Sequence, residues 1–383
     1  MLNLVCKQFR QVCNVIEFGG IMSCETSLSY LKWHNEIIGR IDASGQVSFL
    51  APQFNETVSL YTNGKTEWTF EQFSGFLSER LVSRDRRDIE KILFRCGLSF
   101  YDTLRIAEIT RAIHPKDLLW ASISADERFE DAITSVFDSV FHQKLDLVGE
   151  SINTPEGANI KRYGVYGGQY GIYKKRLSPL ITDVESEIAV YHLAEALGVP
   201  CCPAKRVDKD NIFSAFLYDF SKEYVVHFRR LFDGARGSNE YQNLLSVRPK
   251  FKDSIAKMIL LDFITRQDDR HLSNFAIKLS GGEESFYPLY DNGRSLFYED
   301  TEEMVAQAVK DPKAYATTFG HIDTYWDYAC EIANDYGSIK ELINLDVDKK
   351  DVHQILTNAG FVNYRLDGAA DWIMKTIEML WEL

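Results

Sequence analysis

The first part of the chain changes from a strand-like to a helix-like pattern of hydrophobic positions. Residues 37–41 and 47–50 are mainly apolar and flank residues 42–45, whose Asp and Gly are typical of a hairpin turn. From Thr69, a suitable N-cap, apolar residues recur at the spacing of one helix face; these are Phe73, Phe76, Leu77 and Leu81. Two more helices are predicted in the same part of the chain, over residues 85–96 and 101–113.

The middle of the chain predicts a strand, a helix and a second strand. Residues 170–175 alternate with period 2, which places Lys174 on the same face as Ile172. Apolar residues at helical spacing over residues 183–197, with a glycine directly after them, predict a helix and its C-terminal stop. Residues 212–220 form an apolar run that predicts a further strand.

The last part of the chain is predominantly helical in its pattern. Residues 253–266 carry apolar side chains on adjacent turns, and the pattern from residue 302 to residue 383 is helical throughout. The aromatic residues around Trp326 and Trp372 are typical of helix packing rather than of a surface for stacking nucleic-acid bases. A chain of 383 residues suggests more than one core. We divide it into an N-terminal accessory region and two further parts, over residues 1–125, 126–220 and 221–383.

Charge and cysteine content indicate which partners and which cellular compartment to expect for this protein. The formal net charge is −13, which argues against broad non-specific binding to nucleic acid, although a local basic patch is compatible with that total. The seven cysteines are scattered without a CxxC pair, which favours free thiols in a reducing compartment. No apolar run reaches the roughly 18–20 residues of a membrane span, and no signal peptide is visible. We therefore expect a cytoplasmic protein with no membrane contact.

The strongest chemical signal follows the predicted helix over residues 253–266. Asp269 and Asn274 lie in one short stretch, and Asp291 comes at the end of an apolar and aromatic run. A carboxylate, a carboxamide and a second carboxylate in this order suit metal-assisted phosphoryl transfer. Asp269 would orient the hydroxyl that attacks, while Asn274 and Asp291 would ligate Mg²⁺ on the phosphates.

Two charged residues in the middle of the chain fit the same chemistry. A strand lysine, Lys174, followed by a helix glutamate, Glu187, is the ion pair that holds a kinase lysine over the α- and β-phosphates of ATP; two surface charges are the alternative. Backbone groups near the end of the second apolar strand could meet an adenine edge, at Tyr218, Asp219 and Phe220. The order of elements predicts an α+β, two-lobed protein-kinase-like fold with a small strand-rich lobe, a helical large lobe and an N-terminal accessory region.

A segment rich in Ser, Thr, Asn and Gly precedes the strand that carries Lys174. It spans residues 151–171, and its glycines would let backbone N–H groups turn toward a phosphate. A pair of hairpins without a ligand is the alternative. Further along, Arg229 and Arg230 form a basic stretch that could meet an acidic substrate segment or simply face solvent.

These motifs resemble those of HipA-like serine/threonine kinases, the toxin class of bacterial toxin–antitoxin pairs. Residues 269–275, DRHLSNF, resemble the family's catalytic loop D-x-H-x-x-N-F, and residues 288–291, PLYD, resemble its metal motif. Lys174 lies where the family has its ATP lysine. Residues 157–161, GANIK, resemble its phosphate loop, and the serine that is phosphorylated before that loop aligns with Thr154. The D-R-H segment is also similar to phosphoinositide kinases, but PLYD and the helical tail favour the HipA-like interpretation.

The resemblance implies ATP and Mg²⁺ as cofactors and a protein hydroxyl as the acceptor. Besides Lys174 and the adenine-edge residues, it places Thr154, Gly157, Ala158, Asn159, Lys161 and His271 on the nucleotide, with His271 holding the loop by hydrogen bonds rather than acting as a base. Known members act on aminoacyl-tRNA synthetases, and an antitoxin is an implied partner. Because no basic helix-turn-helix is evident, we expect no direct contact with nucleic acid. A pseudokinase that binds nucleotide without transfer is the alternative from another class.

Overall fold

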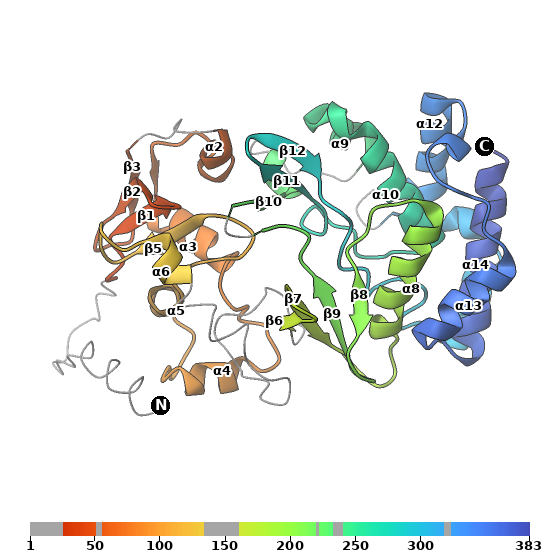
Figure 1. Cartoon of the computed structure of the whole chain (residues 1–383), viewed down its shortest axis with the longest axis horizontal. Helices are drawn as coiled ribbons and strands as arrows, with labels where there is room; N and C mark the ends of the chain where they lie inside the picture. The colour runs from red at the N-terminus through yellow and green to blue at the C-terminus, as the bar shows by residue number, and fades with distance from the viewer. Residues whose placement is uncertain (1–25, 51–55, 134–160, 220–221, 233–239, 318–322) are drawn as a thin grey trace.

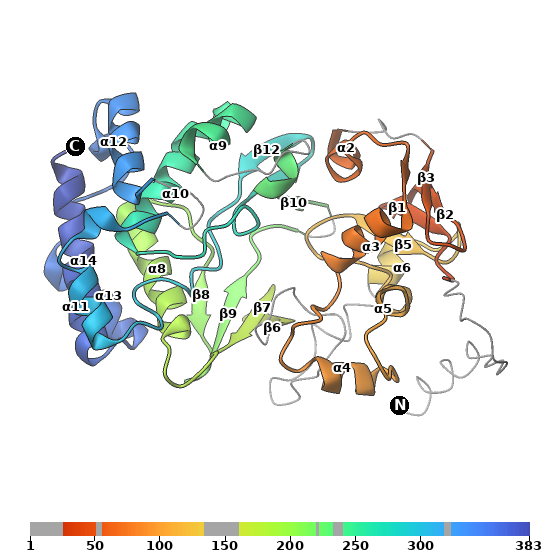
Figure 2. The same ribbon diagram turned by 180° about the vertical axis from the view of Figure 1, so that it is seen from behind.

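The computed structural model describes residues 26–50, 56–133, 161–219, 222–232, 240–317 and 323–383. Within these ranges the fold is mixed α/β with antiparallel sheets. The N-terminal region lies at one end of the molecule, helices α11 (Glu302–Ala308), α12 (Tyr325–Tyr336), α13 (Lys349–Ala359) and α14 (Asn363–Trp381) lie at the other, and a small sheet lies between them (Figures 1 and 2). In the part of the chain that the structure describes, no helix is long and apolar enough to cross a bilayer.

The N-terminal region is built on a five-stranded sheet with strand order β4-β3-β2-β1-β5. Its strands are β1 (Tyr30–Trp33), β2 (Glu36–Ile41), β3 (Val47–Phe49), β4 (Glu67–Trp68) and β5 (Leu119–Ser122). The predicted hairpin is confirmed, since β2 pairs with β3 in antiparallel register. The turn is fixed by Asp42, whose carboxylate accepts hydrogen bonds from the backbone N–H groups of Ser44 and Gln46, each at 2.9 Å.

Among the described residues, this region also contains five helices. They are α2 (Glu56–Thr62), α3 (Phe70–Ser78), α4 (Ile89–Arg95), α5 (Thr103–Thr110) and α6 (Phe129–Ile133). Helix α3 begins as predicted, with a capping box between Thr69 and Gln72. Helices α4 and α5 are shorter than predicted, and α5 ends because Arg111 and Ala112 adopt positive φ angles of 55° and 48°. Helix α6 packs on the sheet through Phe129, whose ring lies 6.2 Å from that of Trp120.

The central sheet has four antiparallel strands in the order β6-β7-β9-β8. They are β6 (Lys161–Tyr166), β7 (Gln169–Lys175), β8 (Ala204–Arg206) and β9 (Asn211–Ala215). Of the predicted glycine-rich segment, Gly167 and Gly168 form the β6–β7 turn at positive φ, and Gly171 lies where a Cβ would come within 2.2 Å of a backbone oxygen of β9. Strand β9 ends at Ala215, before the predicted residue 220, because the chain leaves the sheet and the Leu217 N–H donates to Tyr287 Oη at 3.1 Å.

Helix α8 (Asp183–Leu197) spans the predicted residues and ends at Gly198, whose φ is 71°. A three-stranded sheet follows, with β11 (Ala276–Ser280) between β10 (Tyr224–His227) and β12 (Glu283–Phe286). The remaining helices are α9 (Tyr241–Val247), α10 (Lys252–Ile264), α11 (Glu302–Ala308), α12 (Tyr325–Tyr336), α13 (Lys349–Ala359) and α14 (Asn363–Trp381). The C-terminal part is helical as predicted but is interrupted by 3₁₀ turns at Pro312–Ala314 and Ile339–Glu341. Helix α10 is buried along most of its length and ends just before Asp269.

Candidate active site

One cleft of about 430 Å³ brings together side chains that are far apart in the sequence. Lys174 comes from β7 and Glu187 from α8, while Asp269, Asn274 and Asp291 come from the loops on either side of β11 and β12. All five line this cleft. Strand β7, helix α8 and these two loops therefore converge on one cleft.

Strand register explains how two lysines reach the same carboxylate. Lys161 in β6 lies directly opposite Lys174 in β7. Lys174 Nζ is 3.0 Å from Asp291 Oδ1, and Lys161 Nζ is 3.3 Å from Asp291 Oδ2. Lys174 Nζ also donates to Glu187 Oε1. Lys174 thus links the central sheet, helix α8 and the segment that carries Asp291.

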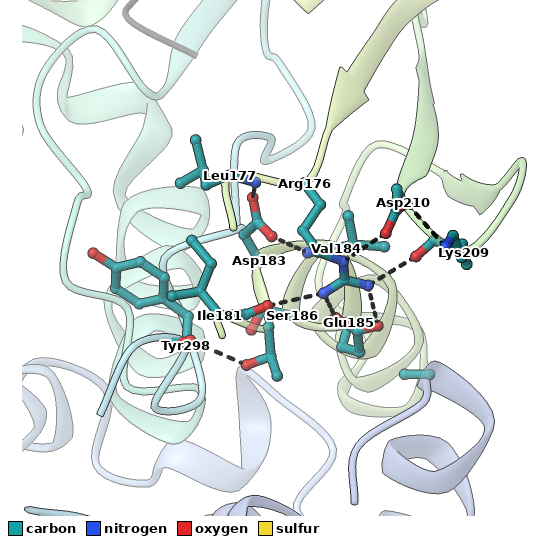
Figure 3. A network of polar contacts seen from close by, with 12 residues as sticks. Arg176, Leu177, Ile181, Asp183, Val184, Glu185, Ser186, Lys209, Asp210 and Tyr298 are labelled. Atoms are coloured by element: carbon teal, nitrogen blue, oxygen red, sulfur yellow. Dashed lines mark hydrogen bonds and ion pairs between the residues drawn. The ribbon is translucent and has the colours of Figure 1, made fainter. Parts of the chain in front are cut away.

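A second ion pair fixes β7 to α8 beside the Lys174–Glu187 contact. Arg176 donates from Nη1 and Nη2 to the two carboxylate oxygens of Glu185, both at 2.6 Å (Figure 3). Its guanidinium also donates to the backbone oxygen of Ile181 at 2.8 Å. Arg176 follows Lys174 by two positions and Glu185 precedes Glu187 by two. Because this bidentate pair joins the same two elements, it restricts their movement relative to each other.

A buried arginine holds the loop of residues 269–274 against the Asp291 segment. Arg270, only 1% exposed, donates from Nε to Asp262 of helix α10 at 3.0 Å. Its Nη1 donates to the backbone oxygens of Asn274 and Tyr290, both at 2.9 Å, and Nη2 donates to Asn292 Oδ1 at 2.6 Å. One guanidinium therefore connects helix α10 with both loops that enter the cleft.

Hydrogen bonds within the catalytic loop set the direction of its side chains. Asn274 donates its amide from Nδ2 to the backbone oxygen of Asp269 at 2.7 Å, so its Oδ1 is the atom that can ligate a cation. His271 Nδ1 accepts a hydrogen bond from the backbone N–H of Ser273 at 3.2 Å. His271 is thus engaged in the loop itself, which fits the structural role expected for it.

Two carboxylates of the cleft, Asp269 and Asp291, have opposite pKa shifts. Burial alone would raise the pKa of Asp291, but the ammonium groups of Lys161 and Lys174 outweigh burial and hold it well below its usual range. Burial raises the pKa of Asp269, and the nearby Arg294 only partly offsets that rise. Asp291 is therefore an anion, the form that could ligate a metal ion, whereas Asp269 has the higher proton affinity of the two.

The donor set fits Mg²⁺ held together with nucleotide phosphates. Mg²⁺ prefers oxygen ligands and is commonly bound through one or two carboxylates and substrate phosphates rather than by a cage made only of protein groups. Asp291 supplies a carboxylate and Asn274 a carbonyl oxygen, both lining the cleft. Among the described residues no cluster of three or more His, Cys, Asp or Glu side chains could hold a metal ion.

The other residues predicted to contact nucleotide are placed as follows. Lys161, Tyr218 and His271 line the cleft, and the buried hydroxyl of Tyr218 has no hydrogen-bond partner among the described residues. Asp219 is not among the described residues that line it, and its N–H donates to Glu223 at 2.8 Å. Five of the predicted residues lie outside the described residues, namely Thr154, Gly157, Ala158, Asn159 and Phe220. Ser151, a nearby alternative to Thr154 as the phosphorylated residue, also lies outside them.

Sequence reasoning missed the contribution of the N-terminal region to the cleft. His114 and Lys116 follow helix α5, and both line the cleft together with His227 of β10. Lys116 Nζ lies 2.9 Å from His227 Nε2. The segment resembles an ordinary connection before β5, so its sequence gives little sign of this role.

Comparison with known proteins gives a likeness in fold. No family model matches the sequence, and no curated protein matches it. HipA of Shewanella oneidensis MR-1, solved in its toxin–antitoxin complex with HipB and operator DNA, superposes with a TM-score of 0.52 at 11% identity, covering 93% of this chain and 99% of that chain. The proinflammatory kinase CtkA of Helicobacter pylori gives a TM-score of 0.45 at 15% identity, covering 57% of this chain and 89% of that chain.

The HipA likeness extends over nearly the whole chain, including the N-terminal region. The resemblance to HipA-like kinases is thus confirmed at the level of fold, and the fold is kinase-like. The absence of direct contact with nucleic acid stays a prediction without support, since the HipA structure contains operator DNA as well as HipB.

Proposed function

We propose that this protein is an ATP- and Mg²⁺-dependent kinase that transfers the γ-phosphoryl group to a Ser or Thr hydroxyl of another protein. The observation that carries the proposal is the position of Lys174, which contacts Glu187 of α8 and Asp291 at once, at the wall of a cleft that Asp269 and Asn274 also line. A lysine, two carboxylates and a carboxamide in one cleft are the groups that phosphoryl transfer from ATP requires.

Each side chain has a distinct part in this chemistry. Lys174, held by Glu187, neutralises the α- and β-phosphates, and Lys161 lies close enough to Asp291 to meet a phosphate there as well. Asn274 and Asp291 would hold Mg²⁺, which when bound offsets the charge on the phosphate oxygens. Asp269 accepts the hydrogen bond of the acceptor hydroxyl and directs its lone pair toward the phosphorus. The bond formed is from hydroxyl oxygen to γ-phosphorus, ADP leaves, and the hydroxyl proton passes to Asp269.

The decisive experiment replaces Asp269 with Asn. We expect Asp269→Asn to abolish the transfer of labelled phosphate from ATP, to the protein itself or to an added substrate, while ATP binding measured by calorimetry is retained. Asp367→Asn is the matched control, because Asp367 is an exposed residue of α14 and is not among the described residues lining the cleft. Full turnover in Asp269→Asn, or no transfer by the unaltered protein, would reject the proposed activity.

A small DNA-binding antitoxin is the partner that fits this proposal. The HipA structure with the same fold contains HipB and operator DNA. We expect such a partner to be encoded beside this protein and to co-purify with it. DNA binding would then be measured for the complex and for this chain alone, to show whether this chain contacts DNA itself.

A further inference from the structure

A smaller hollow of about 90 Å³ adjoins the active-site cleft. Five residues line both hollows, His114, Lys116, Val225, His227 and Ser273. Ser273 belongs to the catalytic loop, so the two spaces meet beside the residues proposed to receive the acceptor hydroxyl. We call the smaller hollow the basic annex; besides the shared residues it is lined by Tyr61, Glu79, Arg80, Asp117, Arg229 and Arg230.

The annex carries more positive than negative charge. Four of its residues are Lys or Arg and two are carboxylates. Both carboxylates already have arginine partners, since Asp117 accepts from two nitrogens of Arg80 at 2.7 Å and Glu79 pairs with Arg230. The other two cationic residues are Arg229 and Lys116, and the Lys116 ammonium contacts His227 Nε2 at 2.9 Å.

Arg229 offers its guanidinium to an incoming group. Its side chain is exposed at the rim of the annex and forms no ion pair with a described residue. Its backbone N–H donates to the oxygen of Leu272 in the catalytic loop at 3.0 Å, so the residue is fixed in place while its side chain is available. A guanidinium presents paired donors that match a carboxylate.

A chain of hydrogen bonds joins the annex to the catalytic loop. The ammonium of Lys116 has only protons to donate, so His227 Nε2, 2.9 Å away, accepts. His227 then carries its proton on Nδ1 and donates to Tyr290 Oη at 3.0 Å, and Tyr290 donates to the backbone oxygen of Ser273 at 3.1 Å. The annex wall is thus part of the same rigid unit as the loop that carries Asp269.

We propose that the basic annex binds an acidic side chain of the protein substrate, an Asp or Glu close to the hydroxyl that is phosphorylated. This inference rests on the proposed kinase function and gives its substrate class. In a chain with a net charge of −13, a cationic hollow beside the acceptor position selects acidic segments and rejects basic ones. The size of the annex suits one carboxylate group. The N-terminal region, which supplies Lys116, would therefore act in substrate recognition.

Binding of labelled peptides tests the annex independently of catalysis. Fluorescence anisotropy would compare three fluorescein-labelled peptides with a central Ser, flanked by Glu, by Gln or by Lys, on the full chain with Mg²⁺ and a non-hydrolysable ATP analogue. We expect the Glu peptide to bind about tenfold more tightly than the Gln peptide, the size of one charge-assisted contact, and the preference to fall with added salt.

Charge-reversed variants provide the controls. Arg229→Glu should lose the preference for the Glu peptide and favour the Lys peptide, and Arg229→Lys should retain part of it. Lys91→Glu makes the same kind of change at an exposed residue of α4 that lines neither hollow, and should behave as the unaltered protein. Equal binding of the Glu and Gln peptides, or the same loss in Lys91→Glu, overturns the annex proposal. Phosphate transfer without an acidic preference rejects the annex alone, whereas acidic binding without any transfer rejects the kinase activity.

Discussion

Replacing Arg270 with methionine tests how far the site depends on one buried charge. The substitution keeps an unbranched apolar stem but removes the guanidinium, which leaves the carboxylate of Asp262, 1% exposed, without its cation. Removing one partner of a buried ion pair typically costs about 3–5 kcal/mol. The backbone oxygens of Asn274 and Tyr290 lose a charged donor as well. We expect Arg270→Met to lose at least about 3 kcal/mol of unfolding free energy at pH 8.

The loss in Arg270→Met should depend on pH. Burial raises the pKa of Asp262, and Arg270 opposes that rise, so the variant's folded state should have an Asp262 pKa further above the unfolded value near 4. A group whose pKa is raised by folding favours the folded state at low pH and disfavours it as pH rises through the folded pKa. The variant should therefore lie closer to the unaltered protein at pH 5.5 than at pH 8.

Urea unfolding followed by tryptophan fluorescence would measure both effects. Asp262→Asn in the Arg270→Met background should recover part of the stability, because the stranded carboxylate is gone. It should not recover phosphate transfer, since the two loops still lack the guanidinium that joins them. A loss below about 1 kcal/mol at pH 8, or one that is the same at both pH values, would refute this reasoning.

Two further predictions concern the cleft. In the pH profile of kcat/KM, the activity should fall on the acid side at a pH above the ordinary Asp range, because burial raises the pKa of Asp269 and transfer needs its carboxylate. Arg294→Met should move this fall in activity to still higher pH, since Arg294 lowers the pKa of Asp269. A pH profile that Arg294→Met leaves unchanged would contradict the role proposed for Asp269. Arg176→Met should lower kcat/KM for ATP roughly tenfold, because the bidentate pair with Glu185 is lost, and Arg176→Lys should restore only part of kcat/KM. An unchanged kcat/KM in Arg176→Met would show that Arg176 does not help to position Lys174.

Features with a local cause could be predicted from the sequence. The capping box at Thr69 and the glycine stop of helix α8 depend on neighbouring residues only, and both lie where predicted. The hairpin between β2 and β3 has a local cause as well. The pairing of Lys174 with Glu187 was predicted from the kinase pattern of a strand lysine followed by a helix glutamate, and the two side chains are joined in the structure.

Features set by distant contacts could not be predicted. Nothing around Lys116 indicates that it lies beside His227, since 111 positions separate them. Arg270 was inside the catalytic motif, but its burial depends on Asp262 and on the returning segment around Tyr290. Strand β9 ends early because the Leu217 N–H donates to Tyr287, which lies 70 positions away. In each case a side chain finds its partner only after the sheets and helices have packed.

Calorimetric binding of ATP with and without Mg²⁺, for the unaltered protein and for Asp291→Asn, tests the central claim most directly. If Lys174, Asn274 and Asp291 surround one metal-bound triphosphate, Mg²⁺ should tighten ATP binding to the unaltered protein about tenfold or more. The same ratio should fall close to one in Asp291→Asn, whose amide is a much weaker ligand. An equal effect of Mg²⁺ on both proteins would contradict the account, because the metal would then be held elsewhere.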